Sequence, residues 1–95
     1  MRDGPAKQQA TRPRLAPHAR LIFDARRGCW VLLAPERLLM PDEVAVEVLR
    51  RCTGQASLEE IVADLARAFE GDRDEIARDV ERLVHDLCGK GVLLS

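Results

Sequence analysis

The segment LAPHARLIFDARRGCWVLLAPERLLMPDEVAVEVLRRCTG, residues 15–54, decides the fold of this 95-residue chain. It opens with two apolar runs, at residues 21–23 and 30–33, which are separated by a short basic loop ending in Gly28. Branched and aromatic side chains suit strands, and glycine can adopt the positive φ that hairpin loops often require. We therefore expect an antiparallel hairpin with strands over residues 18–24 and 29–34.

Pro35 interrupts the apolar pattern directly after this hairpin. Proline has no backbone N–H and fits a bulge or a corner better than a central position of a sheet. Residues 36–40, which include Leu38, Leu39 and Met40, can then form a third strand at the sheet edge. This strand is short and has no obvious partner of its own. Its outer N–H and C=O groups are therefore predicted to be free to pair with another chain.

Three helices are predicted after the third strand. Residues 41–43, Pro-Asp-Glu, favour a helix start, because proline is tolerated in the first turn and carboxylates lie near the positive end of the helix dipole. This helix is expected to end near Gly54. The face that it buries is predicted to consist of Val44, Val48 and Leu49.

Two amphipathic helices with a tight connection over residues 70–73 complete the chain. Ser57 and Glu60 form a capping box for the first of them, and Asp72, with Glu75 three residues later, is expected to cap the second. Their apolar positions follow the helical period. These positions are Leu58, Ile61, Val62, Leu65 and Phe69 in one helix and Ile76, Val80, Leu83, Val84 and Leu87 in the other.

These elements predict an α+β fold, a small three-stranded antiparallel sheet followed by three helices in a winged helix-turn-helix-like arrangement over residues 15–95. The apolar residues 92–94 can return as a short strand or dock on the core. Residues 1–14 have little to bury and are expected to form a disordered or partner-dependent arm. They also lack the apolar core of a signal peptide, and no run approaches the roughly 18–20 residues that span a bilayer. We expect a cytoplasmic protein with no membrane partner.

The net charge of −1 hides an asymmetry between the two parts of the chain. Residues 1–40 contain eight basic and three acidic side chains (+5), whereas residues 41–95 contain seven basic and thirteen acidic ones (−6). The last predicted helix, over residues 73–90, has four basic and five acidic side chains (−1), which is the wrong sign for a helix that approaches phosphates. A DNA-binding regulator therefore remains an alternative by fold analogy alone, and no nucleic-acid partner is expected.

Neither the cysteines nor the histidines form a pattern typical of catalysis. Cys29, Cys52 and Cys88 are far apart in sequence, which argues against a disulfide framework and against a zinc site. His18 and His85 are the only histidines, and neither has a triad-like set of partners. Gly-rich phosphate loops and nucleophile elbows are also missing from the sequence. We expect no enzyme activity, no metal and no cofactor.

The folded part of the chain resembles the PqqD family of pyrroloquinoline quinone biosynthesis. The resemblance covers residues 15–94 and is most specific at the stretches RLAP (14–17), WVLLAPE (30–36), EVL (47–49) and KGVL (90–93). It implies a winged-helix-like recognition domain that binds a precursor peptide, PqqA. It also implies delivery of that peptide to PqqE, a radical S-adenosylmethionine enzyme that cross-links a Glu and a Tyr of the peptide.

Carried onto this chain, the family's binding mode places the peptide as an added strand along Arg37, Leu38, Leu39 and Met40. If Leu38 and Met40 are ordinary core residues, strand alternation allows Leu39 to face the other way, so that the strand can serve both the core and the peptide. Apolar peptide side chains would enter a groove between this strand and a neighbouring helix, whose identity the sequence leaves open. A third hypothesis is a self-associating scaffold, with a homodimer formed through the edge strand or the N-terminal arm.

Overall fold

The computed structural model describes residues 11–95, and its three-stranded sheet agrees with the prediction. Strands β2 (Arg20–Asp24), β3 (Cys29–Ala34) and β4 (Arg37–Leu39) are antiparallel and lie in the order β2-β3-β4. The first and third strands are shorter than expected. Pro35 and Glu36 form a two-residue turn, so the proline occupies a corner, as its missing N–H requires.

Helices α2 (Glu43–Arg50), α3 (Leu58–Phe69) and α4 (Arg73–Gly89) follow the sheet. The predicted capping box of α3 is present, since the Ser57 hydroxyl accepts from the N–H of Glu60 and the Glu60 carboxylate accepts from the N–H of Ser57. The predicted cap of α4 is wrong in one respect. Asp72 occupies the cap position, but its side chain accepts no hydrogen bond there, so the helix begins without a side-chain cap.

The two ends of the described chain meet in a second, smaller sheet. Strand β1 (Arg14–Leu15) pairs antiparallel with β5 (Leu93–Leu94), so residues 92–94 do return as a short strand. The predicted arm, residues 1–14, lies mostly outside the described residues. Its last four residues are described, and they pack on the domain: Pro13 is fully buried, and its carbonyl accepts from the N–H of Gly54.

The hydrophobic core lies between the three helices, the small sheet and one face of the large sheet. Leu32 from β3 and Leu93 from β5 join the buried faces of the helices, and Leu21 and Leu39 pack against this core from the large sheet. The prediction for α2 is wrong at Val44, which is 46% exposed, whereas Val46 is buried. The buried face of α2 instead consists of Ala45, Val46, Val48 and Leu49, so Val44 lies outside it.

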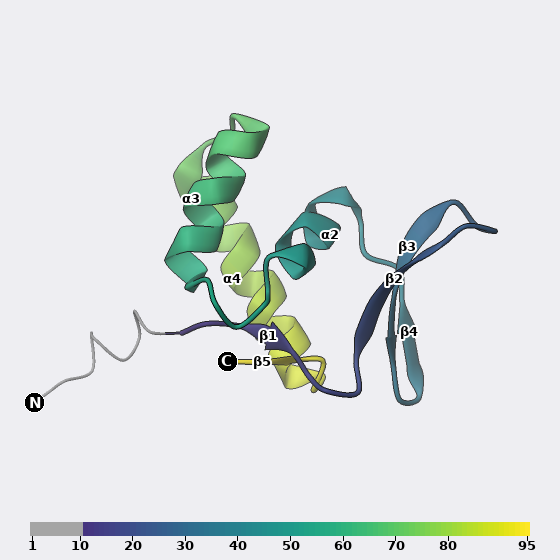
Figure 1. Cartoon of the computed structure of the whole chain (residues 1–95). Helices are drawn as coiled ribbons and strands as arrows, with labels where there is room; N and C mark the ends of the chain where they lie inside the picture. Colours follow the sequence, from purple (N-terminus) through teal and green to yellow (C-terminus); the bar gives the residue numbers. More distant parts are fainter. Residues whose placement is uncertain (1–10) are drawn as a thin grey trace, which may run out of the picture.

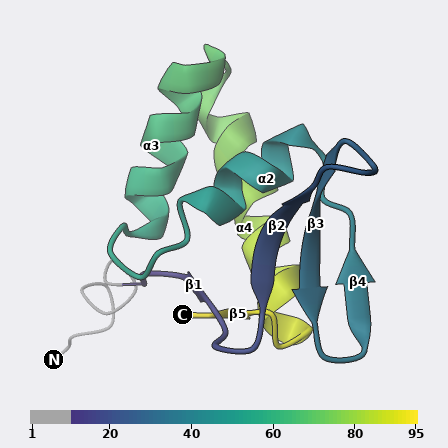
Figure 2. The ribbon, with the colours of Figure 1, turned by 45° about the vertical axis from the view of Figure 1, so that its right-hand side comes forward.

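Figures 1 and 2 show that the fold has two parts. Helices α2, α3 and α4 pack together with β1 and β5, and we call this part the helical body. The sheet β2-β3-β4 projects to one side of α2, and we call it the wing. The chain passes from the wing to the body through Met40 and Pro41, which directly precede α2.

Candidate functional site

Strand β4 forms one edge of the wing and pairs only with β3 among the described residues. Ala34 and Arg37 flank the two-residue turn and are opposite each other. In such a hairpin this pair exchanges its hydrogen bonds, so the backbone N–H and C=O of the next residue, Leu38, point to the open edge. The edge is therefore able to accept an added strand through Leu38.

The side chains of the edge face the opposite way from the prediction. Leu39 is opposite Leu32 and packs against the core, whereas Leu38 is 49% exposed and Met40 is 57% exposed. The reason is the turn, because its two-residue length sets the register and a shift of one residue exchanges the faces of a strand. The structure thus gives the edge an anchored residue, Leu39, between two residues with exposed apolar side chains.

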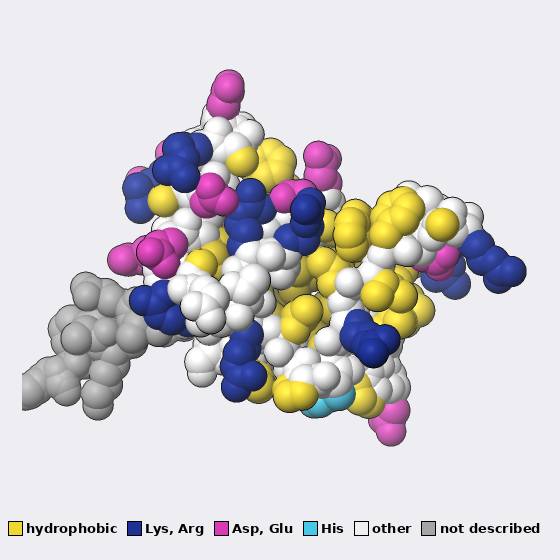
Figure 3. Space-filling model, viewed as in Figure 1, with side chains coloured by type: hydrophobic (Ala, Val, Ile, Leu, Met, Phe, Trp, Pro, Cys, Tyr) yellow, Lys and Arg dark blue, Asp and Glu magenta, His cyan; other side chains and the backbone are white. Residues whose placement is uncertain are grey.

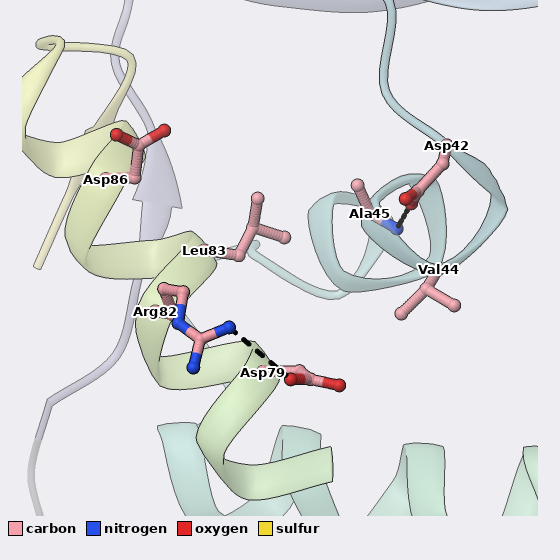
Figure 4. A pocket seen from close by; sticks show the side chains of 7 residues that line it. All are labelled: Asp42, Val44, Ala45, Asp79, Arg82, Leu83 and Asp86. Carbon is pink, nitrogen blue, oxygen red and sulfur yellow. Dashed lines mark hydrogen bonds and ion pairs between the residues drawn. The ribbon is translucent and has the colours of Figure 1, made fainter. Parts of the chain in front are cut away.

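A hollow of about 510 Å³ lies between the start of α2 and the middle of α4, and its lining begins at Asp42, three residues after β4 ends. Figure 4 shows Val44 and Ala45 on one side and Leu83 on the other, with Leu83 extending toward α2. Val44, predicted to be a core residue, is therefore part of the wall of this hollow. An apolar side chain entering here would contact carbon atoms from both helices.

Charged groups of both signs frame the hollow. The carboxylate of Asp42 accepts a hydrogen bond from the N–H of Ala45 at 2.8 Å and so caps α2 (Figure 4). On α4, Nη1 of Arg82 lies 4.0 Å from Oδ1 of Asp79 in an ion pair (Figure 4). Asp86 lies one turn further along α4. The walls therefore combine an apolar centre with polar groups at the rim, the usual composition of a site that binds a ligand with some specificity.

A second, smaller hollow of about 250 Å³ lies where the tip of the wing meets α2. Its lining includes the rings of Phe23 and Trp30, whose centroids are 5.5 Å apart in an edge-to-face arrangement. The guanidinium of Arg50 lies 5.9 Å from the centre of the Trp30 ring. These contacts join the wing to α2 and explain why two large aromatic side chains stand at this junction.

Figure 3 shows how the surface differs between the two parts. Hydrophobic side chains gather over the wing and its junction with α2, and basic side chains stand at the tip of the wing. On the helical side of the same view, acidic and basic side chains are interspersed. Most of the large exposed apolar residues belong to the wing or to the first turn of α2, namely Ile22, Phe23, Leu38, Met40 and Val44.

The described residues contain no group of His, Cys, Asp and Glu that could hold a metal ion. Burial raises the pKa of the Cys52 thiol to about 12, with a smaller contribution from Cys88, and the thiol donates to the carbonyl of Val48. A thiol of this kind is a packing group and not a nucleophile. Both histidines are exposed.

Within residues 11–95, no helix has the length and apolar character needed to cross a bilayer.

The sequence predicts the edge strand but not the residues that line the hollow. It places Val44 in the core, and it gives no sign that Leu83, Arg82 and Asp86 on α4 are part of a site. For Val44 the sequence holds a weak indication of a site, because Val44 lies in the first turn of the helix that follows the edge strand. For the α4 residues there was no local signal, since their position depends on how α4 packs against α2.

The fold and the site together define a class of protein: a small winged-helix-like domain with an open sheet edge beside a hollow, the features of a peptide-recognition module. The family model "Coenzyme PQQ synthesis protein D (PqqD)" matches residues 29–93, which is more than half of the chain. The chain therefore belongs to the PqqD family, as its sequence resemblance indicated.

Curated relatives agree with this assignment. A protein of Rhodopseudomonas palustris (strain BisB5) named "PqqA binding protein" is 48% identical over 85 residues, which cover 90% of this chain and 83% of the relative. A protein of the same name from Xanthomonas oryzae pv. oryzae (strain PXO99A) is 42% identical over 81 residues, covering 85% of this chain and 88% of the relative.

Solved structures confirm the fold. The NMR structure of the PqqD part of Methylobacterium extorquens PqqCD, described as a stand-alone recognition element for ribosomally synthesised, modified peptides, matches with a TM-score of 0.74 and 36% identity, covering 87% of this chain and 88% of that one. Lasso peptide synthetase B1, solved with a leader peptide, has the same fold, with a TM-score of 0.75, 23% identity, and coverage of 90% of this chain and 100% of that one.

Proposed function

We propose that this protein is a non-catalytic peptide chaperone of pyrroloquinoline quinone biosynthesis. It binds the precursor peptide PqqA as a fourth strand along Arg37, Leu38, Leu39 and Met40, and it presents the peptide to the radical S-adenosylmethionine enzyme PqqE. The observation that carries the proposal is the open edge of β4, anchored by Leu39 and flanked by the exposed side chains of Leu38 and Met40. The names of the curated relatives support PqqA as the ligand.

The hollow between α2 and α4 supports a specific form of this binding mode. In an added strand, every second peptide side chain faces the side of the wing on which Leu39 lies. Those side chains would enter the hollow and contact Val44 and Leu83, whose exposed or half-buried carbon atoms they would cover. Backbone pairing with β4 contributes affinity with little sequence preference, and the hollow selects the peptide.

In this proposal the chemistry belongs to PqqE, and this protein contributes proximity. Binding peptide and enzyme at the same time raises the effective concentration of one near the other. The DNA-binding alternative is not favoured, because α4 carries three basic and five acidic side chains, a net charge of −2. A homodimer paired through β4 would occupy the peptide's edge, so peptide and second copy would compete.

The binding mode is tested with a fluorescently labelled PqqA peptide and a pair of variants at one position. Leu38→Pro removes the outward N–H of the edge, while the pairing of β4 with β3 is retained because proline is tolerated on the open side of an edge strand. Leu38→Ala keeps the N–H and shortens only the side chain. Anisotropy titration should show peptide affinity lowered at least about tenfold by Leu38→Pro and about threefold or less by Leu38→Ala.

Circular dichroism and urea unfolding of both variants provide the control, since each should retain the wild-type helical signal. Equal peptide affinity for wild type and a folded Leu38→Pro variant would exclude β4 from the site. Presentation to PqqE is tested separately, by following the Glu–Tyr cross-link with mass spectrometry in the presence and absence of this protein. Equal cross-linking without it would contradict the chaperone role, whatever the peptide affinity.

A further inference from the structure

The side of the wing that faces away from the core is unusually apolar, and we call it the outer face. The β2–β3 and β3–β4 registers place Ile22 opposite Val31, and Leu33 opposite Leu38. Met40 follows Leu38 by two residues and continues the same face beside Val31. The apolar part of the outer face therefore consists of Ile22, Val31, Leu33, Leu38 and Met40, and Arg20, Asp24 and Cys29 lie at its border.

This face is separate from the hydrophobic core. None of its residues belongs to the core cluster or to the partly buried residues packed against it. Val31 in its centre is only 2% exposed, whereas Ile22 at its border is 40% exposed. The centre of the face is thus shielded from solvent, while Ile22, Leu38 and Met40 around it remain exposed. Contiguous apolar surface of this kind marks a site of contact with another molecule.

The charges around the outer face indicate the kind of partner. Arg20 lies opposite Leu33 on this face, and Arg26 and Arg27 lie in the loop at its end; against the one acidic side chain Asp24 they give a net charge of +2. Arg37 lies opposite Ala34 and therefore on the other side of the sheet. The Asp24 carboxylate accepts hydrogen bonds from the backbone N–H groups of Arg26 and Arg27 at 3.0 and 3.3 Å, and the Arg27 guanidinium forms an ion pair with it at 3.5 Å. Arg20 and Arg26 have no such partner among the described residues. The face is therefore an apolar centre in a basic frame.

We propose that the outer face is the surface by which this protein docks on the peptide-modifying enzyme, and that the docking site on the enzyme is an apolar patch with an acidic rim. The inference rests on the proposed function. Its main argument is continuity with the peptide edge, because Leu38 and Met40 belong both to β4 or its extension and to the outer face. One wing can thus serve the peptide through its edge and the enzyme through its outer face.

A peptide bound as an added strand would enlarge the outer face. A peptide paired with β4 directs alternate side chains to the two sides of the sheet, so half of them would extend the outer face beyond Leu38. The enzyme would then contact protein and peptide side chains on one continuous surface. Docking on this surface favours the loaded protein over the free one, which gives the enzyme a way to recognise a delivered peptide.

The test replaces one apolar side chain of equal exposure in each part of the molecule. Ile22→Glu places a charge on the outer face, two strands away from the peptide edge, and Phe69→Glu is the matched control, since Phe69 at the end of α3 is also 40% exposed. Affinity of the peptide-loaded protein for the radical enzyme is measured by biolayer interferometry. Ile22→Glu should weaken it at least about tenfold, and Phe69→Glu less than about twofold.

A charge reversal tests the basic frame. Arg20→Glu, on the outer-face side of β2, should slow association with the enzyme and reduce its dependence on salt concentration. Arg73→Glu, in the first turn of α4, is the matched control and should change neither quantity. An association rate that responds equally to the two reversals would contradict an acidic rim on the enzyme.

The controls separate this inference from the proposed function. Ile22→Glu should bind labelled PqqA as the wild type does, because β4 is unchanged. If the wild type binds neither peptide nor enzyme, the proposed function fails and this inference fails with it. If the wild type binds peptide and enzyme, and Ile22→Glu binds the enzyme as tightly as the wild type does, the outer face is excluded as the docking surface while the proposed function stands. Two other results would overturn the inference. The wild type could form a dimer in sedimentation velocity that Ile22→Glu abolishes, which would assign the face to a second copy. It could instead bind phosphatidylserine vesicles and lose that binding with Ile22→Glu, which would assign the face to a membrane.

Discussion

The helical body and the wing use apolar residues in different ways. In the body, side chains such as Val48, Leu65 and Val80 are almost completely buried between elements. In the wing, only one face reaches the core, and Ile22 and Leu38 are exposed on the other. The charges also differ, because residues 20–40 carry +2 and residues 41–95 carry −6. The body supplies stability, and the wing supplies surface for contacts.

This division explains how a chain of 95 residues can expose so much apolar surface and still fold. The core obtains its strands from both sheets but its bulk from the three helices, and the large sheet contributes to it only Leu21, Leu32, Ala34 and Leu39. The remaining apolar positions of the wing are free to serve binding. Substitutions should therefore affect stability in the body and binding in the wing.

The sharpest test of the comparison exchanges one leucine in each part for alanine. Leu65→Ala in α3 removes a side chain that is 1% exposed and should lower the free energy of unfolding by about 2–5 kcal/mol. Leu38→Ala on the wing should lower it by less than about 1 kcal/mol, because the side chain is already half in solvent. Urea denaturation followed by circular dichroism measures both. Equal losses would mean that the wing is part of the stabilising core.

A second pair of substitutions compares the starts of α3 and α4. Ser57→Ala removes a hydroxyl that accepts the N–H of Glu60 and should cost about 0.5–2 kcal/mol. Asp72→Ala removes no such hydrogen bond and should change stability by less than about 0.5 kcal/mol. The same unfolding assay applies. A large effect of Asp72→Ala would reveal a cap that the structure does not contain.

These two caps illustrate what sequence can and cannot predict. Ser57 and Glu60 form a reciprocal pattern whose partners are only three residues apart, so local chemistry decides the outcome. Asp72 belongs to the same class of residue, yet Glu70 and Gly71 before it set the path of the chain, and its carboxylate is left exposed. Helix positions and strand order follow from local pattern, but the direction of a single side chain often does not.

The candidate site shows the same limit. The edge strand was predictable from Pro35 and the apolar run that follows it. Whether Leu38 or Leu39 faces the core depends on the length of the turn, which is two residues here. A turn longer or shorter by one residue would exchange the two faces of the strand. One wall of the hollow comes from Leu83, which is 44 positions after Leu39 in the sequence. Only the packing of α4 against α2 brings it to the site.

The pH dependence of stability tests a third feature of the body, the ion pairs of Arg51, which caps the end of α2, with Glu47 on α2 and Asp64 on α3. Arg51 donates to the carboxylates of Glu47 and Asp64, and these hydrogen bonds are the largest cause that lowers the pKa of each acid. A lowered folded pKa means that the stabilisation is complete above the unfolded pKa, about 4, and is lost as pH falls through the folded value.

The melting temperature of the wild type should therefore fall between about pH 5 and pH 3. Arg51→Gln should melt lower than the wild type at pH 7 and show a flatter decline over the same range. Its two acids have then lost their strongest partner, and among the described residues Glu47 keeps only Arg50 and Asp64 only Arg67. Differential scanning fluorimetry at intervals of half a pH unit measures both curves. Parallel curves for the two proteins would show that these ion pairs contribute nothing to the pH dependence.

The smallest expected effect concerns the turn that sets the register of the wing. Glu36 has a φ of 63°, a left-handed conformation that costs a side-chain-bearing residue about 1–2 kcal/mol and costs glycine little. Glu36→Gly relieves this strain but adds freedom to the unfolded chain, worth about 0.5–1 kcal/mol, so a net gain of less than about 1 kcal/mol is expected. Glu36→Val, branched at Cβ, should instead destabilise the protein. Because the turn directs Leu38 to the open edge, Glu36→Gly should leave PqqA affinity unchanged in the anisotropy titration. A weaker peptide complex in the more stable variant would mean that the turn controls binding through more than its geometry.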